Sequence, residues 1–432
     1  MSFERPEPPY DWREIPLGAV AELRFSSVDK LTDPSEEPVR LCNYTDVYNN
    51  DYITDDLDFM RASATQPEIV RFGLNVGDVI ITKDSETPDD IGVSTVVDST
   101  SQDLVCGYHL ALIRPNKEDV DPTFLAKQLG HFRLAQYFAQ QANGLTRYGL
   151  PIGAVANTPM WLPELNEQKS VGVVLRLLDE AIAKTEAVIA KLRQVRTGLL
   201  HDLLTLGLDE NGQLRDPVAH PEQFQDSPLG LIPKAWKIAS LVSQISFPEG
   251  QVDPRIDPYC SWTLIAPDHV ESGTGTLLAR VTALQQGAIS GKYMCEPGDV
   301  IYSKIRPYLR KAVLATERGL CSADMYPLRP NEGIDSRFLL AVVLSEAFTR
   351  FASAVSMRSG FPKINRDEMA GFATGWPDSG EQNRIADMLE ATDAETSECA
   401  KELAKLQQLK SGLMDDLLTG RVRVPEGVCC GG

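Results

Sequence analysis

EQKSVGVVLRLLDEAIAKTEAVIAKLRQVRTGLLHDLLT is the stretch from Glu167 to Thr205, and the chain repeats it as EQNRIADMLEATDAETSECAKELAKLQQLKSGLMDDLLT from Glu381 to Thr419. Laid over each other without a gap, the two copies are identical at 14 of 39 positions. The period of this internal repeat is 214 residues (381 minus 167). Because that period is too long for a solenoid, the repeat indicates a chain built from two similar halves.

Apolar residues recur in both copies at alternating steps of four and three, which predicts two long helices with a coiled-coil seam. Neither copy contains proline, and 39 helical residues would extend about 58 Å. A helix of that length needs a partner for its apolar stripe, so we expect the two copies to pack against each other. The seam is Leu178, Ile182, Thr185, Ile189 and Leu192 in the first copy and Thr392, Thr396, Cys399, Leu403 and Leu406 in the second. The Thr and Cys positions of the second seam should weaken one end of this packing.

The composition is that of a globular protein of two or three domains: 432 residues, 43% hydrophobic and 24% charged. No apolar run reaches the length of a membrane span, and no signal region follows Met1, so we expect a cytoplasmic protein. The cysteines form no C-x-x-C pair and the histidines are scattered, which predicts neither a disulfide framework nor a metal site. The net charge of −19 argues against a nonspecific coat on nucleic acid but leaves room for local basic patches.

The repeat suggests a division into six segments, and each globular half should contain a glycine turn followed by a strand, at Val76–Lys83 and at Pro297–Lys304. A strand is expected at Leu110–Ile113, helical spacing runs from Phe124 to Gln141, and the Pro- and Gly-rich connector should be a surface loop. The predicted segments are a first globular half (1–162), a helix (163–207), a connector (208–235), a second globular half (236–376), a second helix (377–424) and a tail (425–432) that contains Cys429 and Cys430.

The chain combines two variable halves with two helices that end in GLLHDLLT and GLMDDLLTGRVRV. The connector between the halves reads DENGQLRDPVAHPEQFQDSPLGLIPKAW. This combination strongly resembles the DNA-specificity subunit of type I restriction–modification systems. The resemblance covers nearly the whole chain. It implies an α+β fold with two pseudo-symmetric mixed α/β target recognition domains, separated by two long antiparallel helices packed as a coiled coil. It also implies that each domain reads one part of a split DNA target. Two methyltransferase subunits, and through them a restriction subunit, would dock on the chain, and S-adenosylmethionine, ATP and Mg²⁺ would bind those partners.

The sequence contains no complete catalytic motif of a methyltransferase or an ATPase. Glu7-Pro8-Pro9-Tyr10 resembles the adenine-methyltransferase motif, but Glu replaces its Asn or Asp and no methyl-donor loop accompanies it. Ser272–Thr276 lacks the third glycine of a dinucleotide-binding turn, and no phosphate loop of the G-x-x-x-x-G-K-[ST] type occurs. We therefore expect no catalytic residues, no cofactor and no metal in this chain.

Basic and aromatic residues suggest where the chain would touch DNA, because Arg and Lys bind phosphates and base edges while Tyr can stack. The strongest signal is the run from Val300 to Thr316, which has four cations, two tyrosines and no acid; an ordinary solvated loop is the alternative. The candidates in the second half are Lys292, Lys304, Arg306, Tyr308, Arg310, Lys311, Arg358 and Lys363. In the first half they are Lys83, Ser94, Thr95, Arg147 and Tyr148, beside an acidic loop.

Repeated polar residues on the two long helices suggest a docking surface used twice, once for each methyltransferase subunit. Helix capping and solvation explain them equally well, since acids are favoured near helix N-termini. These residues are Glu167, Gln168, Asp179, Asp202, Glu381, Gln382, Asp393 and Asp416. A coiled-coil adaptor whose globular ends bind proteins is the competing hypothesis for the whole chain, and the basic run at Val300–Thr316 favours DNA reading over it.

Overall fold

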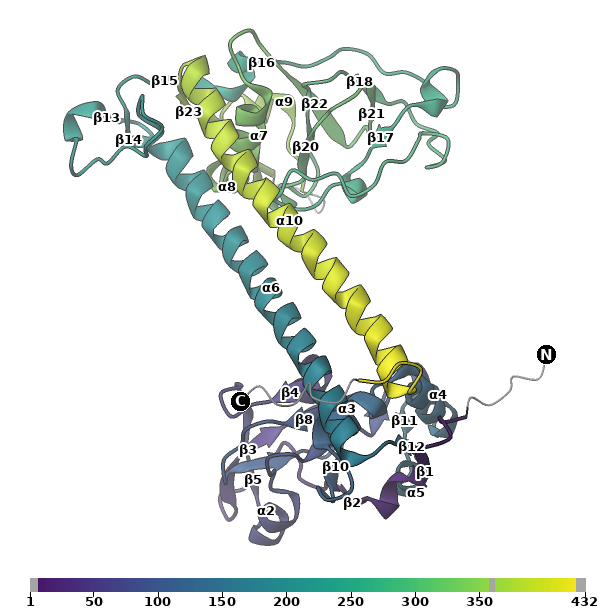
Figure 1. Cartoon of the computed structure of the whole chain (residues 1–432). Coiled ribbons are helices and arrows are strands. Elements are labelled where there is room, and N and C mark those ends of the chain that lie inside the picture. Colours follow the sequence, from purple (N-terminus) through teal and green to yellow (C-terminus); the bar gives the residue numbers. More distant parts are fainter. Residues whose placement is uncertain (1–6, 357–361, 425–432) are drawn as a thin grey trace. The chain divides into compact units, whose positions relative to one another are not determined.

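The computed structural model describes residues 7–356 and 362–424, which fall into two compact units. Unit 1 contains the residues up to Ala187 together with those from Ala400 onward, and unit 2 contains Val188–Cys399. The two long helices are α6 (Leu165–Thr205) and α10 (Ser379–Leu418), and each contributes one half to each unit (Figure 1). The predicted helices are confirmed, and each begins two residues earlier than the repeat alone suggested.

Unit 1 is built on a five-stranded sheet with the order β2-β10-β6-β8-β4 and a three-stranded sheet with the order β5-β3-β9. The strands of the first sheet are β2 (Ala21–Phe25), β10 (Leu110–Pro115), β6 (Val79–Thr82), β8 (Ser94–Val97) and β4 (Tyr52–Ile53). Those of the second are β5 (Met60–Ala64), β3 (Glu37–Cys42) and β9 (Leu104–Cys106). Short pairs join β1 (Arg13–Pro16) to β12 (Pro159–Leu162) and β7 (Asp84–Ser85) to β11 (Tyr148–Gly149). The helices are α1 (Tyr44–Asn49), α2 (Gln66–Phe72), α3 (Pro122–Leu129), α4 (Phe132–Gln141) and α5 (Ile152–Ala156).

Unit 2 repeats this plan with a four-stranded sheet, ordered β16-β22-β19-β20, and a three-stranded sheet, ordered β17-β21-β18. The strands of the first are β16 (Ile245–Ser246), β22 (Met325–Pro330), β19 (Val300–Ser303) and β20 (Ala312–Leu314). Those of the second are β17 (Leu264–Ile265), β21 (Gly319–Cys321) and β18 (Tyr293–Cys295). Strand β15 (Lys237–Ser240) pairs with β23 (Ala373–Trp376), as β1 pairs with β12 in unit 1. The helices are α7 (Ser336–Leu344), α8 (Glu346–Ser356) and α9 (Arg366–Met369).

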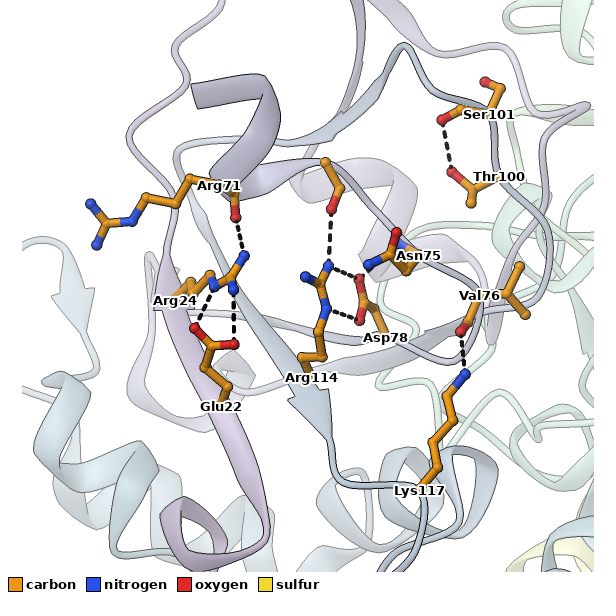
Figure 2. A network of polar contacts seen from close by, with 11 residues as sticks. Glu22, Arg24, Arg71, Asn75, Val76, Asp78, Thr100, Ser101, Arg114 and Lys117 are labelled. Carbon is orange, nitrogen blue, oxygen red and sulfur yellow. Dashed lines mark hydrogen bonds and ion pairs between the residues drawn. The ribbon is translucent and has the colours of Figure 1, made fainter. Parts of the chain in front are cut away.

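A Gly-Asp-Val turn precedes the central strand of each unit, as the sequence predicts. The glycines, Gly77 and Gly298, have φ values of +87° and +93°, which favour residues without a Cβ. The aspartate that follows is buried in both units. Asp78 accepts two hydrogen bonds from Arg114 at 2.8 and 2.7 Å, as Figure 2 shows. Asp299 is bound in the same way by Arg329, at 2.8 Å for both bonds.

The long helices run antiparallel within each unit. In unit 1, Asp179 pairs with Lys410 of α10, and Glu167 pairs with Arg423, which follows α10. The earlier residue of α6 thus meets the later residue of the C-terminal segment, as antiparallel packing requires. In unit 2, Arg196 pairs with Asp393, and Leu208 N–H donates to Glu381 at 2.9 Å. The seam residues of both copies are buried or partly exposed, and those of the second copy are all partly exposed, in agreement with its polar sequence.

Two local predictions need correction. The helical spacing from Phe124 to Gln141 is interrupted between α3 and α4, because the chain leaves the first helix at Gly130 and His131 then caps the second by accepting a hydrogen bond from Arg133 N–H. The connector is not loop throughout. It contains a hairpin of β13 (Phe224–Ser227) and β14 (Gly230–Pro233), whose turn uses Gly230 at a φ of +91°.

No single helix in the described part of the chain is long and apolar enough to span a membrane. Within the described residues, one bent pair of helices passes on length and composition, namely α7 and α8, which meet at 57°. Both helices supply residues such as Phe338 and Phe348 to the buried core of unit 2.

Candidate nucleic-acid interface

A lysine follows the central strand in each unit and makes equivalent backbone hydrogen bonds in both. Lys83 follows β6; its N–H donates to His109 O at 3.0 Å, and its carbonyl accepts from Leu150 N–H at 2.8 Å. Lys304 follows β19; its N–H donates to Asp324 O at 3.0 Å, and its carbonyl accepts from Ile364 N–H at 2.9 Å. These bonds hold a second loop beside each lysine: Arg147 and Tyr148 in unit 1, and Lys363 in unit 2.

Aromatic rings line both lysines. The ammonium of Lys83 lies 4.4 Å from the centroid of Tyr108, and that of Lys304 lies 4.8 Å from the centroid of Tyr326. Each contact is a cation–π interaction, which stabilises a cation in a partly desolvated place. In unit 2 the cluster continues with Arg366, whose guanidinium carbon lies 4.6 Å from the ring of Phe247. Arg366 was not among the predicted residues, although it lies three residues after Lys363, which was.

Positive charge accumulates around Lys304. Burial, and next the charge of Lys363, lower the pKa of the Lys304 ammonium, and burial also lowers the pKa of Lys292. Cations placed close together in a protein of net charge −19 repel one another, and an approaching phosphate would relieve that repulsion. Next to Lys304 the neighbouring cations therefore favour an anionic group, an effect that the charge of Asp324 opposes.

A cleft of about 570 Å³ opens beside these residues in unit 2. Among its lining residues are Lys292, Arg306, Lys311 and the acids Asp268 and Asp324. The ammonium of Lys292 donates to Ser290 at 2.7 Å, and that of Lys311 donates to Pro267 O at 2.6 Å. The structure thus brings together three of the predicted cations and adds two carboxylates that the sequence did not place there.

The exposed candidates of unit 2 are Arg306, Tyr308 and Lys363, and Tyr308 is 56% exposed. Lys292 and Lys304 are buried, and the guanidinium of Arg310 donates to Leu344 O at 3.0 and 2.5 Å. These three are therefore poorly suited to contact a duplex directly without rearrangement. Arg358 lies outside the described residues.

Unit 1 offers a weaker site, as its sequence indicated. Arg147 is exposed and Tyr148 partly so, but Asp84 lies beside them and its carboxylate is 2.9 Å from His109 Nδ1. Thr95 is fully buried on β8, so its prediction as a DNA contact is wrong for this conformation. Ser94 is partly exposed, and its hydroxyl donates to Ala126 O at 2.6 Å.

Four of the eight polar residues predicted to dock partners are buried: Gln168, Asp179, Glu381 and Gln382. The amide of Gln168 accepts from Asp121 N–H at 3.0 Å and donates to Asp119 O and Pro163 O. Gln382 makes the equivalent bonds with Asp335, Gly333 and Pro377. Because these side chains already have internal partners, they join each helix to its globular part, which corrects the docking prediction for these four.

Glu381 has the densest set of these contacts. It binds Arg215 at 2.6 Å and accepts from Leu208 N–H and from the Trp236 indole at 3.1 Å. Its repeat equivalent, Glu167, pairs with Arg423 instead. The remaining candidates for partner docking, Glu167, Asp202, Asp393 and Asp416, are partly exposed and stay a prediction.

Arg196 and Lys410 pair with Asp393 and Asp179, and neither cation was predicted from the sequence. Each lies four residues beyond the last seam residue assigned from the sequence, Leu192 in one copy and Leu406 in the other. Extending the seam of each helix by one more step of four residues would have predicted them.

No family model matches the chain. Among curated proteins, it is 30% identical over 294 residues to the type I restriction enzyme EcoDI specificity subunit of Escherichia coli, a match that spans 62% of this chain and 64% of that relative. It is 21% identical over 429 residues to the type I restriction enzyme MjaVIII specificity subunit of Methanocaldococcus jannaschii, spanning 96% of this chain and 94% of the relative.

Two solved structures share the fold. One is the crystal structure of the type I restriction–modification S subunit from M. genitalium, with a TM-score of 0.57, 13% identity and coverage of 94% of this chain and 96% of that one. The other comes from work on complex assembly and conformational transition of a type I restriction–modification system, with a TM-score of 0.56, 17% identity and coverage of 96% and 100%. By its repeated helices, its two mixed α/β units and these matches, the chain is similar to the specificity subunits of type I restriction–modification systems.

Proposed function

We propose that the chain is the non-catalytic subunit that reads a split DNA target for a type I restriction–modification complex. Unit 1 would recognise one part of the target and unit 2 the other. The observation that carries this proposal is the duplicated strand-end lysine, Lys83 in one unit and Lys304 in the other, held by the same backbone bonds but surrounded by different side chains. One scaffold with two different surfaces suits a target whose two parts differ in sequence.

The exposed polar residues of the long helices would bind two methyltransferase subunits, and through them a restriction subunit. S-adenosylmethionine, ATP and Mg²⁺ would bind those partners rather than this chain. The two-fold repetition of the helices supports two similar docking places, because the residues that are identical at equivalent positions, 14 of 39, present similar surfaces. It agrees with the buried roles of Gln168 and Gln382, which leave the outer faces of the helices for partners.

Genome-wide methylation mapping tests the proposal when it compares cells that carry this gene with cells from which it has been deleted. A split motif whose methylation disappears with the gene is the expected result. The purified complex with its methyltransferase subunits should then bind a duplex carrying that motif more tightly than a scrambled duplex at physiological salt. Equal binding of both duplexes would favour a coiled-coil adaptor, and methyl transfer by the purified chain alone would show it to be an enzyme.

A further inference from the structure

The segment Arg306–Arg310 in unit 2 has an unusual backbone. Arg306 and Arg310 have φ values of +48° and +50°, and within the described residues they are the only non-glycine residues at positive φ. The conformation of Arg306 is doubly unfavourable because it precedes Pro307, which restricts the residue before it to extended structure. Such conformations persist where the surroundings impose them, and they occur often at functional sites.

Four backbone hydrogen bonds hold the segment in this conformation. Arg306 N–H donates to Pro362 O, and Arg306 O accepts from Leu309 N–H, both at 2.9 Å. Arg310 O accepts from Gly273 N–H at 2.9 Å, and the neighbouring Lys311 O accepts from Ser303 N–H at 2.9 Å. The loop is therefore fixed before any ligand arrives, and a fixed loop loses little conformational entropy on binding.

Arg310 anchors the loop by its side chain as well. Its guanidinium binds the carbonyl of Leu344, the last residue of α7, which would otherwise lack a helical partner. Pro307 is buried, whereas Arg306 and Tyr308 are exposed. The loop thus presents two side chains outward on a base that Arg310 and Pro307 hold in place.

We infer that Arg306 and Tyr308 are the base-reading residues of unit 2 and that Arg310 is a positioning residue that does not touch DNA. This inference rests on the proposed function. A planar guanidinium can donate two parallel hydrogen bonds to O6 and N7 of guanine, a contact that demands a fixed orientation and that an ammonium makes less well. A phosphate contact makes no such demand, since the point charge of a lysine ammonium also serves it. The fixed backbone at Arg306 therefore suits base reading, and the target part read by unit 2 should contain a guanine.

The test uses the complete complex with its methyltransferase subunits and duplexes carrying the mapped motif, a scrambled motif, or single base-pair changes in the part read by unit 2. Arg306→Lys keeps the charge, so binding of the scrambled duplex and the salt dependence should not change. Its preference for the motif over the scrambled duplex should fall about 10-fold or more, and the loss should concentrate at one base pair. Tyr308→Ala should reduce the preference at an adjacent base pair.

Lys363→Met is the matched control, because it removes an exposed cation next to the same loop. It should weaken binding to motif and scrambled duplexes by the same factor and reduce the salt dependence. Arg310→Met should lower the preference like Arg306→Lys, whereas Arg310→Lys, which can still donate to Leu344 O, should restore part of it. A purely structural role for Arg310 would lower thermal stability and leave the preference of the assembled complex unchanged.

The outcomes separate the two claims. If the wild-type complex prefers the motif and Arg306→Lys and Tyr308→Ala keep the full preference, the inference is overturned while the proposed function stands. If the wild-type complex itself shows no preference, the proposed function fails and this inference with it. Recognition by unit 1 should stay intact in every variant, which shows that the complex has assembled.

Discussion

Arg196 on α6 and Asp393 on α10 form a two-point ion pair, with 2.9 Å between Nη2 and Oδ2. Lys410 and Asp179 form the equivalent pair in unit 1, with 2.7 Å between Nζ and Oδ1. Lys410 lies 214 residues after Arg196, and Asp179 lies 214 residues before Asp393, which is the period of the repeat. The duplication therefore extends to individual side-chain contacts, and it provides matched pairs for mutagenesis.

Removing the charge of Asp179 should destabilise the protein far more than removing that of Asp393. Asp179 is buried and also binds the buried Lys127 at 2.6 Å and the Tyr52 hydroxyl at 2.8 Å, so Asp179→Asn leaves Lys127 with Asp51, whose side chain is 45% exposed, as its acidic partner at 3.0 Å. We expect a loss of about 3 kcal/mol. The side chain of Asp393 is 40% exposed, and Asp393→Asn should cost less than about 1 kcal/mol. Urea unfolding measures both, and equal losses would contradict the role of burial.

Gln168→Leu and Gln382→Leu should each loosen the unit to which the residue belongs. Each glutamine satisfies one backbone N–H and two backbone carbonyls, and leucine leaves all three without that partner. The expected loss is about 3 kcal/mol for either variant. Hydrogen exchange should accelerate at the amide of Asp121 in Gln168→Leu and at that of Asp335 in Gln382→Leu. Faster exchange at both amides in either variant would mean that the glutamines do not act separately.

His131 should make the protein less stable in mild acid. Burial lowers the pKa of its imidazole, an effect that Asp415, 3.7 Å away, opposes only in part. Below the ordinary histidine pKa of 6.5, the unfolded chain then binds more protons than the folded chain, so stability falls as the pH decreases through that region. His131→Asn keeps an N-cap acceptor and does not titrate. Its melting temperature should therefore drop less than that of the wild type between pH 7.5 and 5.5, and equal drops would exclude His131 as the cause.

Lengthening both long helices should lengthen the gap in the DNA target if they set its spacing. Because α6 and α10 each contribute one half to each unit, four residues must be added to both, after Ala183 and after the equivalent Ser397. Four residues add about 6 Å and nearly restore the helical phase, which corresponds to one or two base pairs at about 3.4 Å each.

Methylation mapping measures that gap. The two recognised sequences should stay the same, because no side chain that reads them has changed. Insertions of two residues turn the following seam by about 200°, and these variants should fail to assemble. An unchanged gap with full methylation after the four-residue insertions would show that the helices do not determine spacing.

The sequence by itself determined the duplicated plan of this protein. Helix periodicity and the gapless match between residues 167–205 and 381–419 depend on local spacing, and local spacing is written in the order of residues. The Gly-Asp-Val turns are equally local, since Gly77 and Gly298 take a φ that few other residues tolerate. The basic run from Val300 to Thr316 likewise identified, from composition alone, the segment that contains Arg306 and Tyr308.

Only the tertiary structure decided which polar side chains are available to a partner. Gln168 and Asp179 repeat along a helix just as an exposed docking residue would, and their burial depends on Asp121, Lys127 and Tyr52, which come from distant parts of the sequence. The same holds for Arg310, which belongs to a run of cations but binds Leu344 O, 34 residues away. Whether a charged group faces solvent or the protein interior depends on the contacts made by segments far apart in the chain, and a one-dimensional pattern does not contain those contacts.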